Sequence, residues 1–433
     1  MNDYLQAARE AATFIAAQRL EGRAKWRKAA ERGASDYGLY HGSCGIILLL
    51  LELHAATGDR HALGQAVAAG SEVAGHLGRV ERLSVSVASG WPGYAFVLAE
   101  LARASGREDF GDLAAQCLER LRAQATRIGG GIGWIEPMPF SDITGFTGDR
   151  EIHDQSVGAA GAALVFLYAH RHGLHPTALT WAVEAGRRLM EVGEPDADGL
   201  RWRMMSDMPF PFTAPNFAHG GAGVGYLMAE LYKATGDAPF LEAAEAAGRY
   251  VLGRASAVGD GRLVPHTEEA PRPLFYLGAC HGPPGTGRLF LELHAITEEG
   301  AWLMAARALM RGLMNLGAPE TRSAGLWNNH GQCCGDAGIG EFALLMAGRT
   351  GEAAYLDLAR RCADVILRES TLEDGARRWT QAEHRDRPAL LETQTGYMQG
   401  AAGIASFLIH LATTLEGRPI KIPLPDWPAD AAA

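Results

Sequence analysis

A short block recurs seven times along this chain and limits its possible folds more than any other feature of the sequence. Each copy reads G-x-x-G and is followed at once by eight mainly apolar residues without proline. Four of these runs end in Glu-Leu. The copies begin at Gly42, Gly90, Gly158, Gly220, Gly282, Gly335 and Gly400. Because runs this apolar cannot keep a wide face in water, we expect each copy to begin a buried helix.

Amphipathic, alanine-rich segments alternate with these runs, and their charged faces indicate helices on the outside of the molecule. They cover residues 4–20, 62–77, 109–126, 178–192, 239–252, 301–316 and 352–368. The alternation of seven inner and seven outer helices predicts an all-α protein whose repeats form a closed α/α toroid. An open helical solenoid is the alternative, and the strongly apolar inner helices argue against it.

The glycine pair suggests how each repeat is built. We expect glycine to permit a turn with positive φ before each inner helix, and to let neighbouring helix starts approach closely. The toroid is expected to cover residues 1–418, and the proline- and alanine-rich tail, residues 419–433, to pack loosely on its surface. Strand signals are weak. The long irregular segments 194–218, 255–279 and 370–399 are expected to be functional loops.

The composition excludes several classes of protein. A net charge of −10 argues against binding to nucleic acid or to an anionic membrane surface. The longest apolar run, residues 46–51, is too short to span a bilayer, and the N-terminal residues do not resemble a signal peptide. Six cysteines are too few for a disulfide scaffold in 433 residues. We therefore expect a reducing, cytoplasmic location, where clustered cysteines bind metal or act in catalysis.

Three cysteines fall in register with the repeat. Cys280 and Cys333 both stand two positions before the first glycine of their repeats, and Cys334 follows directly. In a toroid these positions converge at one mouth. Zinc prefers tetrahedral thiolate and imidazole ligands, and a catalytic site keeps one position open, so the three cysteines fit a catalytic zinc site. His281, in the register of Cys334, is the competing third ligand. The isolated Cys44, Cys117 and Cys362 are expected to be buried filler.

Two further residues are predicted to lie at the same mouth. His219 stands one position before its glycine, and Asp154 stands four positions before Gly158. Both suit acid–base chemistry. The alternative roles are structural: a capping histidine, and an aspartate that caps a helix. His41 and His153 are interpreted as structural.

Four motifs resemble those of the lanthionine synthetase C-like proteins: GACHGPPG, QCCGDAG, FAHGGAG and HDQSVGAAG. The resemblance spans essentially the whole chain, and the two cysteine motifs are its most specific part. It implies zinc bound by Cys280, Cys333 and Cys334. It also implies acid–base or positioning roles for His219 and Asp154.

The chain departs from the family pattern at three positions. The family commonly has histidine where this chain has Cys334, although a minority of members look similar with three cysteines. A tryptophan usually stands at the position of Ala279, and an arginine at that of Tyr276. Any enolate-stabilising role of that arginine is left without a residue here. Arg272 and Arg288 are candidate replacements.

The resemblance implies a cyclase that adds a peptide cysteine thiol to dehydroalanine or dehydrobutyrine, forming lanthionine or methyllanthionine rings in a ribosomal peptide. We expect His219 to protonate Cα and Asp154 to position or deprotonate the thiol. No kinase or dehydratase domain is evident, so a separate enzyme would supply the dehydrated precursor peptide.

Three other functions are considered. The chain could add glutathione to dehydrated residues, or be a non-catalytic, zinc-containing, peptide-binding partner of a dehydratase. A toroid glycosidase needs paired acids. Asp154 has no second carboxylate in register, which argues against that function.

Overall fold

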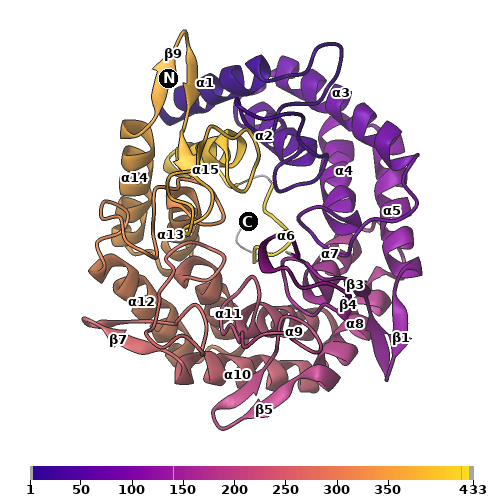
Figure 1. The fold of residues 1–433 in the computed structure, drawn as a ribbon, viewed down its shortest axis with the longest axis vertical. Helices are drawn as coiled ribbons and strands as arrows, with labels where there is room; N and C mark the ends of the chain where they lie inside the picture. The colour runs from indigo at the N-terminus through magenta and orange to yellow at the C-terminus, as the bar shows by residue number, and fades with distance from the viewer. Residues whose placement is uncertain (1–2, 140, 421, 429–433) are drawn as a thin grey trace.

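The computed structural model describes residues 3–139, 141–420 and 422–428, and this part of the chain is mostly helical. Seven helices surround a common centre (Figure 1). They are α2 (Ser43–Thr57), α4 (Trp91–Ser105), α7 (Ala159–Arg171), α9 (Gly221–Thr235), α11 (Pro283–Thr297), α13 (Asp336–Thr350) and α15 (Ala401–Leu415). Each begins directly after the first glycine of a repeat, so the buried helices predicted from the repeat are confirmed.

Seven amphipathic helices lie outside them (Figure 1). They are α1 (Asp3–Ala17), α3 (Arg60–Leu77), α5 (Glu108–Ala123), α8 (Ala178–Val192), α10 (Ala238–Gly253), α12 (Gly300–Asn315) and α14 (Ala353–Arg368). Each buries one apolar stripe against an inner helix: α1 packs on α15, and each of the others packs on the inner helix that precedes it in the chain. The predicted bounds differ from these by at most a few residues. None of the helices in the described ranges has the length and apolarity needed to cross a membrane.

The connecting loops contain short antiparallel hairpins that the sequence does not reveal. The pairs are β1 (Thr126–Ile128) with β2 (Gly131–Gly133), β3 (Ile135–Pro137) with β4 (Asp149–Glu151), β5 (Glu194–Asp196) with β6 (Gly199–Arg201), β7 (Ser256–Val258) with β8 (Gly261–Leu263), β9 (Thr371–Glu373) with β10 (Ala376–Arg378), and β11 (Gln381–Ala382) with β12 (Leu391–Glu392). A four-residue helix, α6 (Ser141–Thr144), lies between β3 and β4. Strands this short have too few residues to show an alternating pattern.

The inner helices contact one another in chain order. Each of α2, α4, α7, α9, α11 and α13 packs on the next inner helix along the chain. The last, α15, packs on α2 and is covered by α1. The first and last repeats are therefore neighbours.

The two glycines of each repeat allow close packing, and neither adopts a positive φ. The first glycine of every repeat is the N-cap of its inner helix, with φ between −105° at Gly42 and −154° at Gly220, so the predicted positive φ is wrong. The second glycine faces the carbonyl oxygen six residues earlier. A Cβ at Gly93 would lie 2.2 Å from the oxygen of Val87, and one at Gly403 would lie 1.8 Å from that of Tyr397.

The second glycine also meets the neighbouring repeat, which confirms the predicted close approach of helix starts. A Cβ at Gly285 would lie 2.7 Å from Cβ of Phe217, three positions before the first glycine of the preceding repeat. At Gly45 the equivalent neighbour is Tyr397 of the last repeat, at 2.5 Å. Side chains are excluded here because successive repeats touch through their backbones.

A circuit of hydrogen bonds links the residues two positions before each first glycine. The main-chain bonds are Tyr40 N to Ala88 O (3.0 Å), Ser156 N to Ala218 O (3.1 Å), Ala218 N to Cys280 O (2.9 Å), Cys280 N to Cys333 O (3.1 Å), Cys333 N to Met398 O (2.9 Å) and Met398 N to Tyr40 O (3.1 Å). Between Ala88 and Ser156 the Ser86 hydroxyl takes part: it accepts from Ala88 N (3.0 Å) and donates to Ser156 O (3.1 Å). We call this set the hydrogen-bond circuit. It returns to the residue at which it starts.

Polar side chains join the inner helices at a second level, and most of them stand ten positions after the first glycine of their repeat. His410 of α15 lies 3.0 Å from Glu52 of α2 and 2.8 Å from Glu341 of α13. Further round, the Tyr168 hydroxyl donates to Glu100, and Lys233 contacts both Glu230 and Glu292. The acids that end the Glu-Leu runs thus connect neighbouring helices within the core.

The C-terminal tail does not pack loosely on the surface, contrary to expectation. Ile422 and Trp427 are buried, and Asp426 pairs with the buried Arg288 of α11 at 2.9 Å. The tail lies toward the centre of the helices (Figure 1). Residues 421 and 429–433 of the predicted tail lie outside the described residues, and a boundary at residue 418 stays a prediction.

The glycine geometry predicts a large cost for adding one methyl group. Gly93→Ala places Cβ against the Val87 carbonyl, so we expect the free energy of unfolding to fall by about 2 to 3 kcal/mol. Gly64→Ala, on an exposed face of α3 where a Cβ meets nothing within 4 Å, should instead stabilise by about 0.5 to 1 kcal/mol. Chemical denaturation of both variants measures the two effects. Equal effects would contradict the close approach.

The His410 cluster predicts a pH dependence of stability. Burial lowers the pKa of His410, but Glu341 and Glu52 outweigh it and raise this pKa well above 6.5. The folded protein then holds a proton that the unfolded chain, with a histidine pKa of about 6.5, releases first. The stabilisation is full below that value and is lost as pH rises through the folded pKa. We expect His410→Gln to be less stable than wild type near pH 6, with a gap that narrows at alkaline pH. His61 is exposed, so His61→Gln should show no such pH-dependent difference in stability from wild type.

Candidate active site

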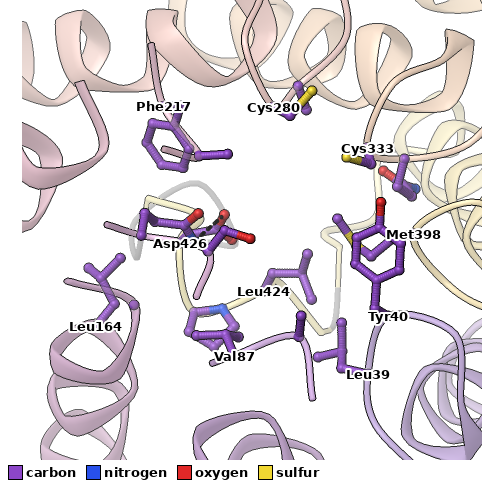
Figure 2. A pocket seen from close by; sticks show the side chains of 18 of the residues that line it. Leu39, Tyr40, Val87, Leu164, Phe217, Cys280, Cys333, Met398, Leu424 and Asp426 are labelled. Atoms are coloured by element: carbon purple, nitrogen blue, oxygen red, sulfur yellow. Dashed lines mark hydrogen bonds between the residues drawn. The ribbon is translucent and has the colours of Figure 1, made fainter. Parts of the chain in front are cut away.

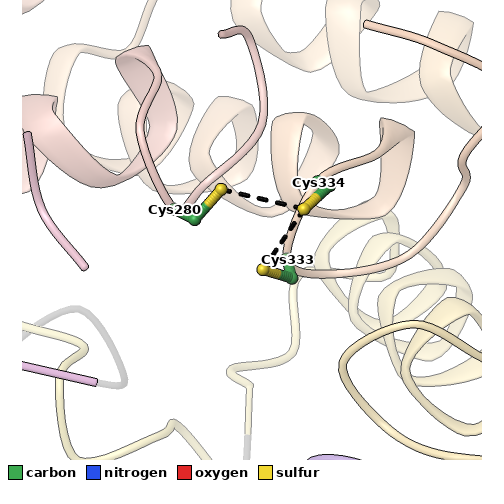
Figure 3. Close-up of side chains that lie close together, drawn as sticks. All are labelled: Cys280, Cys333 and Cys334. Atoms are coloured by element: carbon green, nitrogen blue, oxygen red, sulfur yellow. Dashed lines mark hydrogen bonds between the residues drawn. The ribbon is translucent and has the colours of Figure 1, made fainter. Parts of the chain in front are cut away.

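The hydrogen-bond circuit brings the three candidate metal ligands together. Cys280 precedes α11, Cys333 and Cys334 precede α13, and the bond from Cys280 N to Cys333 O holds the two loops side by side. The three Sγ atoms all lie within 4.8 Å of one another. Sγ of Cys334 lies 3.7 Å from that of Cys280 and 3.4 Å from that of Cys333 (Figure 3). A single cation can contact all three sulfurs.

Hydrogen bonds favour negative charge on this cluster. Those from Cys280 and Cys334, with a further one from the Tyr40 phenol, hold the pKa of the Cys333 thiol well below its usual range despite burial. The same contacts raise the pKa of Cys280. Gln399 Nε2 donates to Cys334 Sγ at 3.5 Å and to the Tyr40 oxygen at 3.0 Å.

His281 does not join the cysteine cluster. Among the described residues, the ligand atoms that gather within 4.8 Å belong to Cys280, Cys333 and Cys334 alone. The imidazole of His281 instead packs on His266, with ring centroids 4.3 Å apart, and lies 5.4 Å from the ring of His219. Burial, followed by His266 and His219, lowers the pKa of His281 well below 6.5. It is therefore a neutral packing residue at neutral pH.

His219 and Asp154 form a hydrogen-bonded pair. Asp154 Oδ2 lies 2.7 Å from His219 Nδ1, and Oδ1 accepts from the backbone N–H of Val157 at 2.7 Å. The Asp154 side chain is only 1% exposed. Burial lowers the pKa of His219, but Asp154 more than offsets this and the pKa is raised. Asp154 thus shapes its loop and orients the imidazole, but it does not cap a helix, because the N-cap of α7 is Gly158.

Two cavities meet at the circuit. A mouth cavity of about 810 Å³ is lined by His219, Cys280 and Cys333, with Glu136, Glu383 and Arg82 around it. A smaller inner chamber of about 100 Å³ lies beside it, lined mainly by apolar side chains (Figure 2). Residues common to both are Tyr40, Ala88, Ser156, Ala218, Cys280 and Cys333. Cys280 and Cys333 therefore lie where the two cavities adjoin.

Charged side chains lie at the mouth cavity and beside Tyr276, where the family usually has an arginine. Glu383 lies 3.2 Å from both His41 Nε2 and Lys28 Nζ. Arg385 Nε donates to the Tyr276 hydroxyl at 3.2 Å, so an arginine does reach the position that lacks one in the sequence. Of the two candidates named earlier, Arg272 is exposed, whereas Arg288 is buried at the inner chamber.

Sequence reasoning missed three residues of the site. Tyr40 and Gln399 stand in the registers of Cys333 and Cys334, in the first and last repeats. The last repeat lies next to the repeat that contains Cys333 and Cys334, and the first repeat lies next to the last. This order brings both residues to the sulfurs, so their positions in the repeat could have predicted them. Arg385 gave no such signal, because it lies in the loop between β11 and β12, outside the repeat.

Known proteins with a similar fold include both cyclases and carbohydrate-active enzymes. Nisin cyclase superposes with a TM-score of 0.61 at 16% identity, covering 88% of this chain and 89% of that one. Cellobiose 2-epimerase from Bacillus thermoamylovorans superposes with a TM-score of 0.55 at 10% identity, covering 96% and 100%. A family 76 α-mannanase from Bacteroides thetaiotaomicron gives 0.52 at 14%, covering 96% and 97%. At these identities the likeness concerns the fold alone.

The family is shown by sequence. No curated protein matches the chain. The model of the lanthionine synthetase C-like proteins, however, matches residues 149–421, which include Asp154, His219 and the three cysteines. This segment is well over half of the chain. The chain belongs to the lanthionine synthetase C-like family.

Proposed function

We propose that this protein is a zinc-dependent cyclase that adds a peptide cysteine thiol to dehydroalanine or dehydrobutyrine and so forms lanthionine or methyllanthionine rings. The observation that carries the proposal is the cluster of three thiols beside the His219–Asp154 pair in one large cavity. Family membership and the fold shared with nisin cyclase support it. The substrate is a dehydrated precursor peptide supplied by a separate enzyme, and the location is the cytoplasm.

The residues present fit a zinc ion. Zinc is bound by thiolates in tetrahedral sites, and three protein ligands leave one position for substrate. The three sulfurs lie close enough to share one ion, and Gln399 and Tyr40 supply hydrogen bonds to Cys334 and Cys333. We further propose that the helices form a closed α/α toroid, which the contacts of α15 with α1 and α2 support.

The reaction forms one C–S bond and moves one proton. Bound zinc would supply the substrate thiol as thiolate at neutral pH. When the sulfur attacks Cβ, the C=C electron pair moves to Cα, and a proton must reach that carbon. His219, whose pKa is raised by Asp154, holds a proton at this site and is the proposed donor. Asp154 is buried behind it, so it acts by positioning His219 and not by touching the thiol.

Two other functions remain as outcomes of the assays. Glutathione could be the thiol substrate, because the mouth cavity of about 810 Å³ is large enough for a small peptide. A purely binding role would need no proton donor, which the His219–Asp154 pair argues against.

The metal site is tested by elemental analysis. We expect about one zinc per chain in wild type, as three close thiolates and an open position predict. Cys280→Ala should weaken zinc binding by more than about 100-fold, because loss of an outer hydrogen-bond partner alone costs 10- to 100-fold. Cys117→Ala, which changes a buried cysteine on α5, should retain full zinc content. A wild-type protein prepared without chelators that binds no zinc would refute the mechanism.

Catalysis is tested with a dehydrated peptide that contains one cysteine. Ring formation leaves the mass unchanged and removes the free thiol, so alkylation followed by mass spectrometry measures it. His219→Asn should lower kcat by about 10²- to 10⁴-fold through loss of the proton donor. Asp154→Asn lowers the pKa of His219, so the alkaline limb of the pH profile should move to lower pH.

Controls separate the alternatives. His219→Asn and Asp154→Asn should both keep zinc, since neither residue is a proposed ligand. Addition of one glutathione mass to the peptide would indicate the glutathione substrate. Wild-type kcat in His219→Asn would exclude this residue as the donor.

A further inference from the structure

The inner chamber has a floor made by the C-terminal tail. Leu424, Pro425 and Asp426 line it opposite side chains from the inner helices and their loops (Figure 2). Its walls are mainly aliphatic and aromatic: Leu39, Val87, Leu164, Phe217 and Met398. Cys280 and Cys333 form part of the same lining. The chamber therefore opens next to the sulfurs where the reacting cysteine is proposed to bind.

The tail is anchored at this place by several independent contacts. Asp426 pairs with Arg288 at 2.9 Å and accepts a hydrogen bond from Gln155 at 3.2 Å. The guanidinium of Arg288 also lies over the ring of Trp427, 4.9 Å from its centroid, and Trp427 itself is buried. Asp426 and Arg288 thus pair with each other at the floor, and the surface left to a ligand is mainly apolar.

From this geometry we propose that the inner chamber is a specificity pocket for an aliphatic side chain on the residue next to the reacting cysteine, with its depth set by Leu424. The proposal rests on the cyclase function proposed above. Adjacent Cα atoms are only about 3.8 Å apart, so a cysteine whose sulfur joins the cluster brings its neighbour to the chamber entrance.

The chamber volume limits which side chains fit. At about 100 Å³ it is smaller than the cavity of about 150 Å³ that holds benzene in an apolar protein core. A valine or leucine side chain can be buried there, at a gain of about 0.8 kcal/mol for each methylene. A tryptophan side chain cannot enter without displacement of the tail.

The test uses three dehydrated peptides that differ only in the residue next to the cysteine: alanine, leucine or phenylalanine. In wild type we expect kcat/KM for the leucine peptide to exceed that for the alanine peptide by about 10-fold. Leu424→Phe fills the chamber and should abolish this preference while leaving the alanine peptide unaffected. Leu424→Ala enlarges the chamber and should raise kcat/KM for the phenylalanine peptide by about 10-fold relative to wild type.

Matched controls make the result decisive. Leu372→Phe makes the same change on an exposed residue of β9, and should alter no ratio. Zinc content and circular dichroism confirm that each Leu424 variant is folded. If Leu424→Phe changes all three peptides equally, or none, the pocket is refuted while the cyclase function stands.

A second readout does not require catalysis. Binding of the corresponding undehydrated peptides to the zinc-loaded protein, measured by calorimetry, should show the same order of preference. If no peptide is cyclised but this order is seen and Leu424→Phe removes it, the pocket stands and the catalytic proposal fails. Affinities that do not depend on the neighbouring residue would overturn the pocket.

Discussion

The hydrogen-bond circuit is the interaction on which the rest of this structure depends. It joins the segments before all seven inner helices through bonds between equivalent positions, and the Ser86 hydroxyl bridges the one place without a direct main-chain bond. Such bonds need backbones in contact, which is why the glycines that follow cannot carry side chains. The apolar inner helices supply the burial, but the circuit decides which residues meet. Cys280 and Cys333 are two of its members, so the circuit places two of the three proposed metal ligands side by side.

This origin explains how much could be predicted from sequence. The repeat, the helices and the convergence of Cys280, Cys333 and His219 all follow from the one or two positions that precede the first glycine of each repeat. The same register would have indicated Tyr40 and Gln399, had the neighbour relation of the last and first repeats been carried through. Of the two uses of glycine that were predicted, close approach is confirmed and positive φ is wrong. Sequence does not separate conformational freedom from close approach.

Features outside the repeat could not be predicted. Arg385 reaches Tyr276 from a loop whose path depends on tertiary contacts, and no periodicity positions it. The tail is rich in proline and alanine, and this composition gave little indication of burial. Its position depends on single residues: Trp427 beneath a guanidinium, and Asp426 opposite Arg288. Arg288 lies in a strongly apolar inner helix, so its burial demands a partner. The sequence therefore indicates that Arg288 needs an acidic partner, but it does not indicate which acid that is.

The same reasoning accounts for a third cysteine where a histidine is common in the family. In the proposed zinc site, three thiolates around one divalent cation would leave a net negative charge, which would raise the reactivity of a bound substrate thiolate and oppose its binding. Gln399 and Tyr40 donate hydrogen bonds to Cys334 and Cys333 and so disperse part of that charge. His219 adds a raised-pKa imidazole nearby, whose proton compensates more of it. His281, kept neutral by burial, adds no competing charge. The hydrogen-bond donors around the sulfurs thus suit a cysteine at position 334. Replacing Cys334 alone would leave those donors next to a site with less negative charge.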